Sequence, residues 1–212
     1  MATEQMEECL EAIGRLEERG ERATTSSLAH ALQVSAPSVT EMLGRLSARG
    51  LVSYRPRGEI VLSESGRALA RTVMRRHRLW ERFLHDVLGV RWDSLHDEAC
   101  RLEHATSSLV ERELARAIGD SDTCPHGQAI PTSDGELVLE PSIPLTDLKP
   151  SMSGRVVSVS EDDPAVLRKL EELGIEPGVV VEMRSLDMAS GEAVLRRDGV
   201  DRSVPGTVVS AV

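Results

Sequence analysis

The sequence predicts a mainly α-helical fold with small β parts: a winged helix-turn-helix domain, a central helical domain and a small C-terminal β-barrel. Apolar residues recur at helical spacing through most of residues 7–118. A turn-rich, acidic stretch follows at 120–150, and the last part of the chain holds short apolar segments that are typical of strands. Aromatic residues are only 2% against 40% hydrophobic residues, so we expect aliphatic cores. The expected domain boundaries are 1–70, 71–140 and 141–212.

Composition restricts the class of protein further. Three cysteines, unevenly spaced, argue against a disulfide framework. No apolar run approaches the ~18 residues of a membrane span, and the first residues are acidic where a signal peptide would be basic. We therefore expect a cytoplasmic protein that does not enter a membrane. The net charge of −10 does not exclude a nucleic-acid partner, because residues 22–62 carry five arginines against two glutamates.

The first domain is predicted from three helices and a hairpin. A helix over 7–20 precedes two short helices, at 24–32 and 36–50, whose first residues are hydroxyl side chains suited to N-caps. Two short helices joined by a tight turn are typical of a helix-turn-helix. Alternating strands at 51–55 and 59–62 then form a hairpin, which is the wing of a winged helix or, alternatively, an addition to a purely helical domain.

The second helix of the pair is the one that would enter a major groove. Its small residues are suited to base edges and thymine methyl groups, and the arginines nearby are suited to phosphates. Glu41 either accepts a hydrogen bond from a cytosine amino group or is simply solvated. The candidate DNA-binding residues are Ser35, Pro37, Ser38, Thr40, Glu41, Arg45, Arg49, Arg55 and Arg57.

Three further helices are expected at 64–88, at 92–105 and from Ser107 or Ser108 to Ile118, with glycines at 89 and 119 as stops. Their apolar residues exceed what three helices can bury among themselves. A symmetric homodimer is the simplest way to bury the remainder.

These helices also carry metal-ligating side chains on shared faces. On one helix His96, Cys100, Glu103 and His104 fall within a sector about 100° wide, and on another His77 and Glu81 are an i, i+4 pair. Nitrogen, oxygen and sulfur donors together are typical of a divalent transition-metal site. Either stretch alone is more often a solvated pair, and the presence of both favours the metal.

The stretch 120–150 is predicted to be a linker that packs in places. Cys124 and His126 lie close together in it, but with no second pair of ligands in reach we interpret them as loop residues. Beyond the linker we expect a small barrel with a helix at 164–173 that begins after acidic residues. Its strands are expected at 154–159, 179–184, 193–197 and 207–212.

Three motifs carry a resemblance to a known family: Ser35-Ala36-Pro37-Ser38-Val39-Thr40, Val73-Met74-Arg75-Arg76-His77-Arg78-Leu79 and His96-Asp97-Glu98-Ala99-Cys100-Arg101-Leu102-Glu103-His104. Over essentially its full length the chain resembles the diphtheria toxin repressor family. The resemblance implies a C-terminal SH3-like (FeoA-like) domain and a homodimeric, metal-dependent transcriptional repressor of metal homeostasis genes, not an enzyme. It further implies that metal acts as co-repressor and that the partner is a palindromic double-stranded DNA operator.

The same resemblance implies two metal sites per subunit. The primary site would hold Glu8, Cys100, Glu103 and His104, and the ancillary site His77, Glu81 and His96. The SH3-like domain sometimes completes the ancillary site; here Asp163 falls near a ligand position, but Val166 stands where a second polar ligand is expected.

The chain departs from both branches of the family, because iron-responsive members have Met at the position of Glu8 and manganese-responsive members generally have acids at the positions of Glu8 and Cys100. The thiolate favours Fe²⁺, with Mn²⁺ second and Co²⁺ or Zn²⁺ as substitutes in vitro. Two alternatives stay open. One is a thiol redox regulator that uses Cys100 and Cys9. The other is a helical di-metal enzyme, although the Glu-x-x-His spacing of such bundles is missing.

Overall fold

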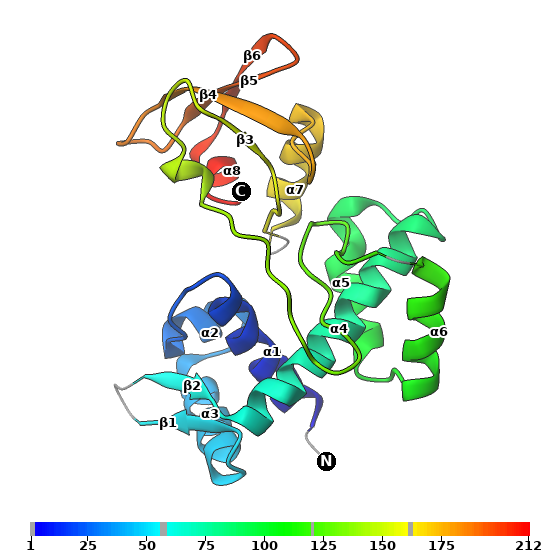
Figure 1. The fold of residues 1–212 in the computed structure, drawn as a ribbon. Helices are drawn as coiled ribbons and strands as arrows, with labels where there is room; N and C mark the ends of the chain where they lie inside the picture. Colours follow the sequence, from blue (N-terminus) through cyan, green and yellow to red (C-terminus); the bar gives the residue numbers. More distant parts are fainter. Residues whose placement is uncertain (1–2, 56–58, 120, 161–162) are drawn as a thin grey trace. The chain divides into compact units, whose positions relative to one another are not determined.

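The computed structural model describes residues 3–55, 59–119, 121–160 and 163–212, and its elements follow the predicted order (Figure 1). The chain forms two compact units. The first unit comprises Met1–His77, Cys100–Glu113 and Ile130–Leu139, and the second comprises Arg78–Ala99, Leu114–Ala129 and Glu140–Val212.

The first unit contains the helix-turn-helix. Thr24 accepts a hydrogen bond from the backbone of Ser27, and Ser35 accepts one from Ser38, so the predicted hydroxyl N-caps are confirmed. The three helices enclose an aliphatic core in which Leu10, Ile13 and Leu43 are fully buried. The elements are α1 (Glu4–Glu18), α2 (Thr25–Ala31), α3 (Ala36–Ala48), β1 (Val52–Tyr54) and β2 (Ile60–Leu62).

The wing is an antiparallel hairpin in which Val52 pairs with Leu62 and Tyr54 with Ile60. Its turn, with the candidate Arg57, lies outside the described residues. Glu17 of α1 holds the hairpin's base: its carboxylate accepts hydrogen bonds from the backbone of Leu62 and from Arg67 on the next helix. The first helix is therefore joined both to the wing and to the helix that follows it.

Three helices follow the wing, as predicted. The region expected to be one helix over 92–105 begins instead with a 3-10 turn, and Gly89 and Gly119 have the positive φ angles of helix-ending glycines. The elements are α4 (Glu64–Asp86), η1 (Trp92–Ser94), α5 (Leu95–Glu103) and α6 (Ser108–Ile118).

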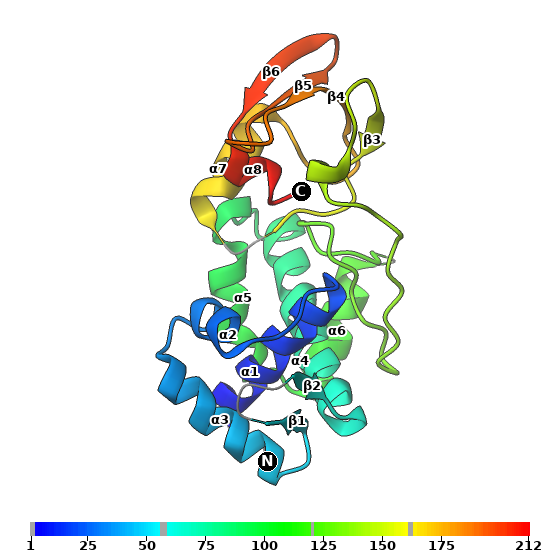
Figure 2. The same ribbon diagram turned by 90° about the vertical axis from the view of Figure 1, so that its left-hand side faces the viewer.

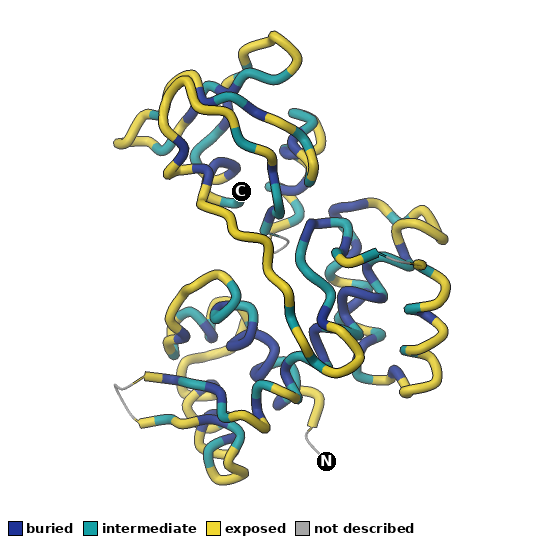
Figure 3. Tube along the Cα trace, in the orientation of Figure 1, coloured by how far each residue is buried: buried dark blue, intermediate teal, exposed yellow. Residues whose placement is uncertain are grey.

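Arginines of α4 hold the segment that precedes the C-terminal domain. In the first unit Arg71 and Arg75 donate to backbone carbonyls of residues 135 and 131. In the second unit Arg78 and Arg82 donate to carbonyls of residues 129 and 123. These contacts satisfy backbone groups in a segment without regular structure. Apart from the contact of Arg71 with residue 135, residues 132–144 are mostly exposed (Figure 3).

The C-terminal domain is a four-stranded antiparallel sheet in the order β3-β4-β5-β6 (Figure 2). Two strand predictions are wrong here. Residues 207–212 do not form a strand but begin with a short buried helix, and the last strand lies earlier in the chain. Of the strand expected at 154–159, only the first two residues lie in a strand. The elements are η2 (Leu145–Asp147), β3 (Ser153–Arg155), α7 (Pro164–Leu173), β4 (Val180–Leu186), β5 (Ala193–Arg197), β6 (Val200–Val204) and α8 (Gly206–Val209).

A tight turn explains the missed strand. Asp198 and Gly199 both have positive φ, as a two-residue turn with right-handed strand twist requires, and they join β5 directly to β6. The apolar, β-branched run after Pro205 reads as a strand, but Val208 and Val209 bury their side chains from α8. No helix among the described residues combines the length and apolar character needed to cross a membrane.

Candidate metal centre

One face of α1 is lined with carboxylates. Glu4, Glu7, Glu8 and Glu11 follow the i, i+3, i+4, i+7 spacing that places side chains on one side of a helix. Exposure decreases along this row, from the exposed Glu4 to Glu11, which is buried. A row of acids that enters the interior requires positively charged or protonated partners.

A glycine brings this face close to α4. A Cβ atom at Gly14 would lie 3.0 Å from the Met74 sulfur and 3.4 Å from the Ala70 methyl group, so the Met74 and Ala70 side chains of α4 lie directly against the backbone of α1 here. Three residues after Met74, His77 lies fully buried, with Nδ1 3.9 Å from Glu11 Oε1.

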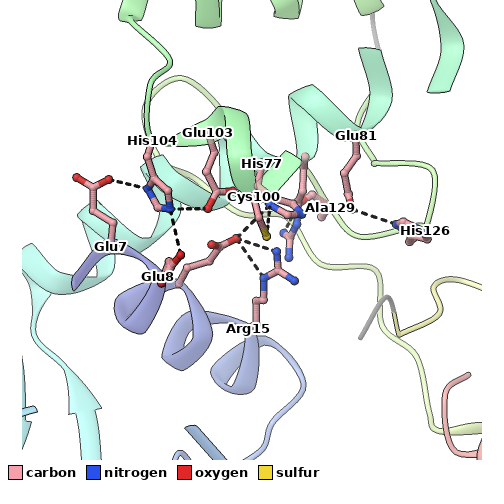
Figure 4. A network of polar contacts seen from close by, with 12 residues as sticks. Glu7, Glu8, Arg15, His77, Glu81, Cys100, Glu103, His104, His126 and Ala129 are labelled. Carbon is pink, nitrogen blue, oxygen red and sulfur yellow. Dashed lines mark hydrogen bonds and ion pairs between the residues drawn. The ribbon is translucent and has the colours of Figure 1, made fainter. Parts of the chain in front are cut away.

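The buried carboxylate of Glu103 lies between two imidazoles. Its Oε2 accepts a hydrogen bond from His77 Nδ1 at 2.6 Å, and its Oε1 lies 3.1 Å from His104 Nε2 (Figure 4). Cys100, one turn earlier on α5, places Sγ 3.9 Å from His77 Nδ1. Each oxygen of Glu103 thus faces a different group of ligating atoms.

The carboxylates around His104 favour its protonated form. Glu7 Oε2 lies 3.0 Å from its Nδ1, and Glu8 Oε1 lies 3.9 Å from its Nε2. Burial alone lowers the pKa of His104, but the hydrogen bonds and charges of Glu103 and Glu7 outweigh burial and raise that pKa to about 9. Burial also raises the pKa of Glu8. A metal that binds His104 must therefore displace a proton.

The donor atoms form two adjacent groups that fit a divalent cation. The ligating atoms of Glu11, His77 and Glu103 lie within 4.8 Å of one another, as do those of Glu4, Glu8 and His104. Carboxylate oxygen, imidazole nitrogen and a nearby thiol are ligands that Fe²⁺ and Mn²⁺ accept. Glu103 belongs to the first group, and its Oε1 also lies 3.1 Å from His104 of the second, so the two groups are adjacent at this residue.

The structure brings Glu8, Cys100, Glu103 and His104 into this centre together with His77. Glu7 and Glu11 were not among the predicted site residues. Their signal was the acidic i, i+3, i+4 row on the first helix, which is easily mistaken for ordinary acids near a helix N-terminus.

A second group lies in the second unit. Glu81, Cys124 and His126 are all buried, and their ligating atoms lie within 4.8 Å of one another. Glu81 Oε1 is 3.2 Å from His126 Nδ1, while His126 Nε2 donates to the backbone carbonyl of Trp92 at 3.2 Å. The Trp92 ring stacks on the imidazole with centroids 5.2 Å apart. The hydrogen bond from Nε2 to Trp92 favours the tautomer that leaves Nδ1 able to ligate, whereas the Glu81 carboxylate favours a proton on Nδ1.

Cys124 and His126 were interpreted as loop residues because no second pair of ligands was in reach, but the structure places them beside Glu81, more than forty positions earlier on α4. Of the predicted ancillary set, His77 belongs to the first unit, and Glu81 and His96 to the second. That set stays a prediction. Asp163 caps α7 by accepting from the backbone of Ala165.

The candidate DNA-binding residues that are described are all exposed. Thr40 and the residues around it lie on the first turns of α3, and Arg55 lies at the end of β1. The hydroxyl of Ser35 also caps α3, so this residue has a structural role whether or not it contacts DNA. The exposed set is Ser35, Pro37, Ser38, Thr40, Glu41, Arg45, Arg49 and Arg55.

Comparison with known proteins assigns the three parts of the chain. Residues 1–60 match the family model of the iron dependent repressor N-terminal DNA binding domain, and residues 63–132 match its metal binding and dimerisation domain. Residues 143–212 match the FeoA domain. The iron-dependent repressor IdeR of Mycobacterium leprae (strain TN) is 34% identical over 189 residues, covering 83% of this chain and 82% of the relative. The chain belongs to the diphtheria toxin repressor family.

Further members of the diphtheria toxin repressor family agree. The diphtheria toxin repressor of Corynebacterium jeikeium (strain K411) is 32% identical over 197 residues, covering 82% of each chain. A solved manganese-dependent transcriptional repressor in complex with manganese superposes with a TM-score of 0.91 at 31% identity, over 97% of each chain. Family membership makes the chain a metal-dependent, DNA-binding transcriptional repressor and not an enzyme. The predicted family, function and fold class are confirmed.

Proposed function

We propose that the chain is a homodimeric repressor of metal homeostasis genes, activated when a divalent cation joins α1 to α5 and to His77 of α4. The buried Glu103, whose two oxygens face two histidines, carries this proposal. The metal supplies the positive charge that a row of carboxylates lacks once His104 has lost its proton. Glu8, Cys100, Glu103 and His104 would be ligands, with Glu7, Glu11 and His77 beside them.

The path from metal to DNA runs through α1. This helix provides core residues of the helix-turn-helix and, through Glu17, holds the wing. Fixing the position of α1 would therefore fix the orientation of the whole winged helix-turn-helix domain. In a symmetric dimer the two α3 helices would then be separated by the distance between successive major grooves of a palindromic operator, ~34–36 Å or a multiple.

We propose Fe²⁺ as the physiological metal and Mn²⁺ as the second candidate. The Cys100 thiolate favours Fe²⁺, whereas the carboxylates of Glu7, Glu8 and Glu11 suit Mn²⁺. Co²⁺ or Zn²⁺ would substitute in vitro. A second cation per subunit would bind either Glu81 with Cys124 and His126, or the set expected from the family, which is His77, Glu81 and His96.

The redox alternative is disfavoured by the state of its second thiol. Cys9 is fully buried, and burial raises its pKa to about 12, so it is not a reactive thiolate at neutral pH.

An anaerobic titration of DNA binding with Fe²⁺, Mn²⁺, Co²⁺ and Zn²⁺ tests the proposal. The native chain should bind a selected operator duplex only with metal, and Cys100→Ala should need more Fe²⁺ while changing less with Mn²⁺. Cys9→Ala is the matched control and should behave like the native chain. Operator binding that follows oxidant and ignores all four metals would overturn the proposal.

A further inference from the structure

A permanently charged side chain, that of Arg15, lies beside the row of carboxylates on α1. Arg15, one turn after Glu11 on α1, donates from Nε and Nη2 to Glu11 Oε1, at 3.2 and 2.8 Å (Figure 4). The pair is nearly buried, with side-chain exposures of 11% for Arg15 and 6% for Glu11. It thus differs from a solvated i, i+4 pair, which contributes little to the stability of the fold.

The oxygen that Arg15 holds also faces the metal ligands. Glu11 Oε1 lies 3.9 Å from His77 Nδ1, and Glu11, His77 and Glu103 form one of the two ligating groups. A guanidinium stays charged at any pH at which the protein is folded. A cation that binds this group must therefore compete with Arg15 for the same carboxylate.

We infer that Arg15 is an internal competitor that sets the metal concentration at which the Glu11–His77–Glu103 subsite fills. The inference rests on the proposed metal function. In the metal-free protein the guanidinium neutralises Glu11 and stabilises the buried cluster. On metal binding the carboxylate turns from Arg15 to the cation, and the energy of the lost pair is subtracted from the metal affinity.

Removing Arg15 should change the free energies of the metal-free and the metal-bound protein by different amounts. Glu11 and Glu103 would be two buried carboxylates with less positive charge near them, which raises the free energy of the metal-free fold. The metal-bound form would lose little, because the cation itself supplies the charge. The difference between the two states appears as tighter metal binding.

Arg15→Met tests this inference, because methionine retains much of the apolar stem and removes the charge. Mn²⁺ binding measured anaerobically by calorimetry should be at least tenfold tighter than in the native chain. The metal-free variant should unfold at a lower temperature and gain more from added Mn²⁺. Arg184→Met is the matched control, since Arg184 also forms a pair with a glutamate, Glu182, but in β4 of the C-terminal domain. It should leave the Mn²⁺ affinity unchanged.

Two further variants make the result decisive. Glu11→Gln combined with Arg15→Met removes the carboxylate for which the two cations compete, so its Mn²⁺ affinity should not exceed that of the native chain. Should Arg15→Met not fold without metal, Arg15→Lys keeps the charge but loses the two-nitrogen contact, and should bind Mn²⁺ about threefold tighter.

A folded Arg15→Met protein with native or weaker Mn²⁺ affinity would overturn the inference, as would native affinity in Arg15→Lys where only that variant folds. Failure of the proposed function looks different. In that case the native chain itself binds no Mn²⁺, or binds it with an affinity that Glu103→Gln does not change.

Discussion

Glu103 shows how a single side chain can serve two ligating groups. It is buried, its Oε2 accepts from His77 and its Oε1 faces His104. In the metal-free protein these contacts satisfy a carboxylate that would otherwise be costly to bury. The same two oxygens are available to a cation once His104 has lost its proton and His77 no longer donates to Oε2.

Replacing this carboxylate should nearly abolish metal binding at the centre. Loss of residues that only support metal ligands typically costs roughly 10- to 100-fold in affinity, so Glu103→Gln, which removes a shared ligand, should weaken Mn²⁺ binding by more than that. Calorimetry on the metal-free protein measures the effect, and circular dichroism checks that the variant is folded. A loss of less than tenfold would contradict the role of Glu103.

The raised pKa of His104 predicts how the centre responds to pH. The folded pKa of about 9 lies above the ordinary value of 6.5, so this group stabilises the metal-free fold fully below pH 6.5 and loses that effect as pH rises through 9. Metal binding displaces the same proton, so Mn²⁺ affinity should rise by up to about tenfold per pH unit between pH 7 and 9.

His104→Gln should remove this part of the pH dependence along with much of the affinity. Equal Mn²⁺ affinities of the native chain at pH 7 and pH 8.5, measured in buffers that do not bind the metal, would show that no proton leaves with metal binding.

At the scale of elements, the close packing of α1 on α4 at Gly14 places the ligands of one helix against those of the other. Gly14→Leu would insert a side chain where a Cβ alone already meets Met74 and Ala70. Overpacking of this kind typically costs about 1–3 kcal/mol, and the separation of the helices should also weaken Mn²⁺ binding at least tenfold.

Gly44→Leu is the matched control for this substitution. Gly44 is also inside a helix, but a Cβ there meets nothing within 4 Å, so leucine should leave the affinity unchanged and should not destabilise the fold. Thermal unfolding compares the stability of the two variants, and calorimetry compares their Mn²⁺ affinities. Unchanged metal binding in Gly14→Leu would mean that α1 is not positioned by this contact.

The elements also show what could be predicted from sequence. Helices with clear apolar spacing and hydroxyl caps, such as α3 behind Ser35, were predicted correctly because their signals are local. The strand β6 was missed because its evidence was a two-residue Asp198-Gly199 turn, and a β-branched run at Val208 gave a stronger but false strand signal. The group formed by Glu81 and His126 joins residues far apart in sequence, so no local pattern could reveal it.

At the scale of the whole molecule, the second unit contains a contact that holds the FeoA-like domain. Asp93 of η1 is buried and accepts from Arg168 of α7 at 2.8 Å, with Arg91 on its other side at 2.7 Å. The hydrogen bond from Arg168 is the main cause that lowers the pKa of Asp93, against the effect of its burial. Its neighbour Trp92 stacks on His126, so one short turn contacts both α7 and the second ligating group.

Asp93→Asn should loosen the attachment of α7. The lost charge should cost about 1–2 kcal/mol, because hydrogen bonds to charged groups contribute about 1.5–3 kcal/mol and Arg168 is half exposed, which reduces the effect. Faster cleavage in the exposed 132–144 segment under limited proteolysis should accompany the loss. Ser94→Ala, which changes only a minor partner of Asp93, is the control, and equal cleavage rates in the two variants would count against the contact.

If metal joins α1 to the dimerisation helices, it orients the two winged helix-turn-helix domains of the dimer. Metal binding and DNA binding must then strengthen each other by the same factor. The most direct test is the Mn²⁺ affinity of the native chain, measured anaerobically with and without a saturating operator duplex selected from random DNA. The account predicts at least tenfold tighter Mn²⁺ binding with the duplex, and the same factor for DNA binding with and without Mn²⁺. Identical metal affinity in the presence and absence of operator DNA would contradict it.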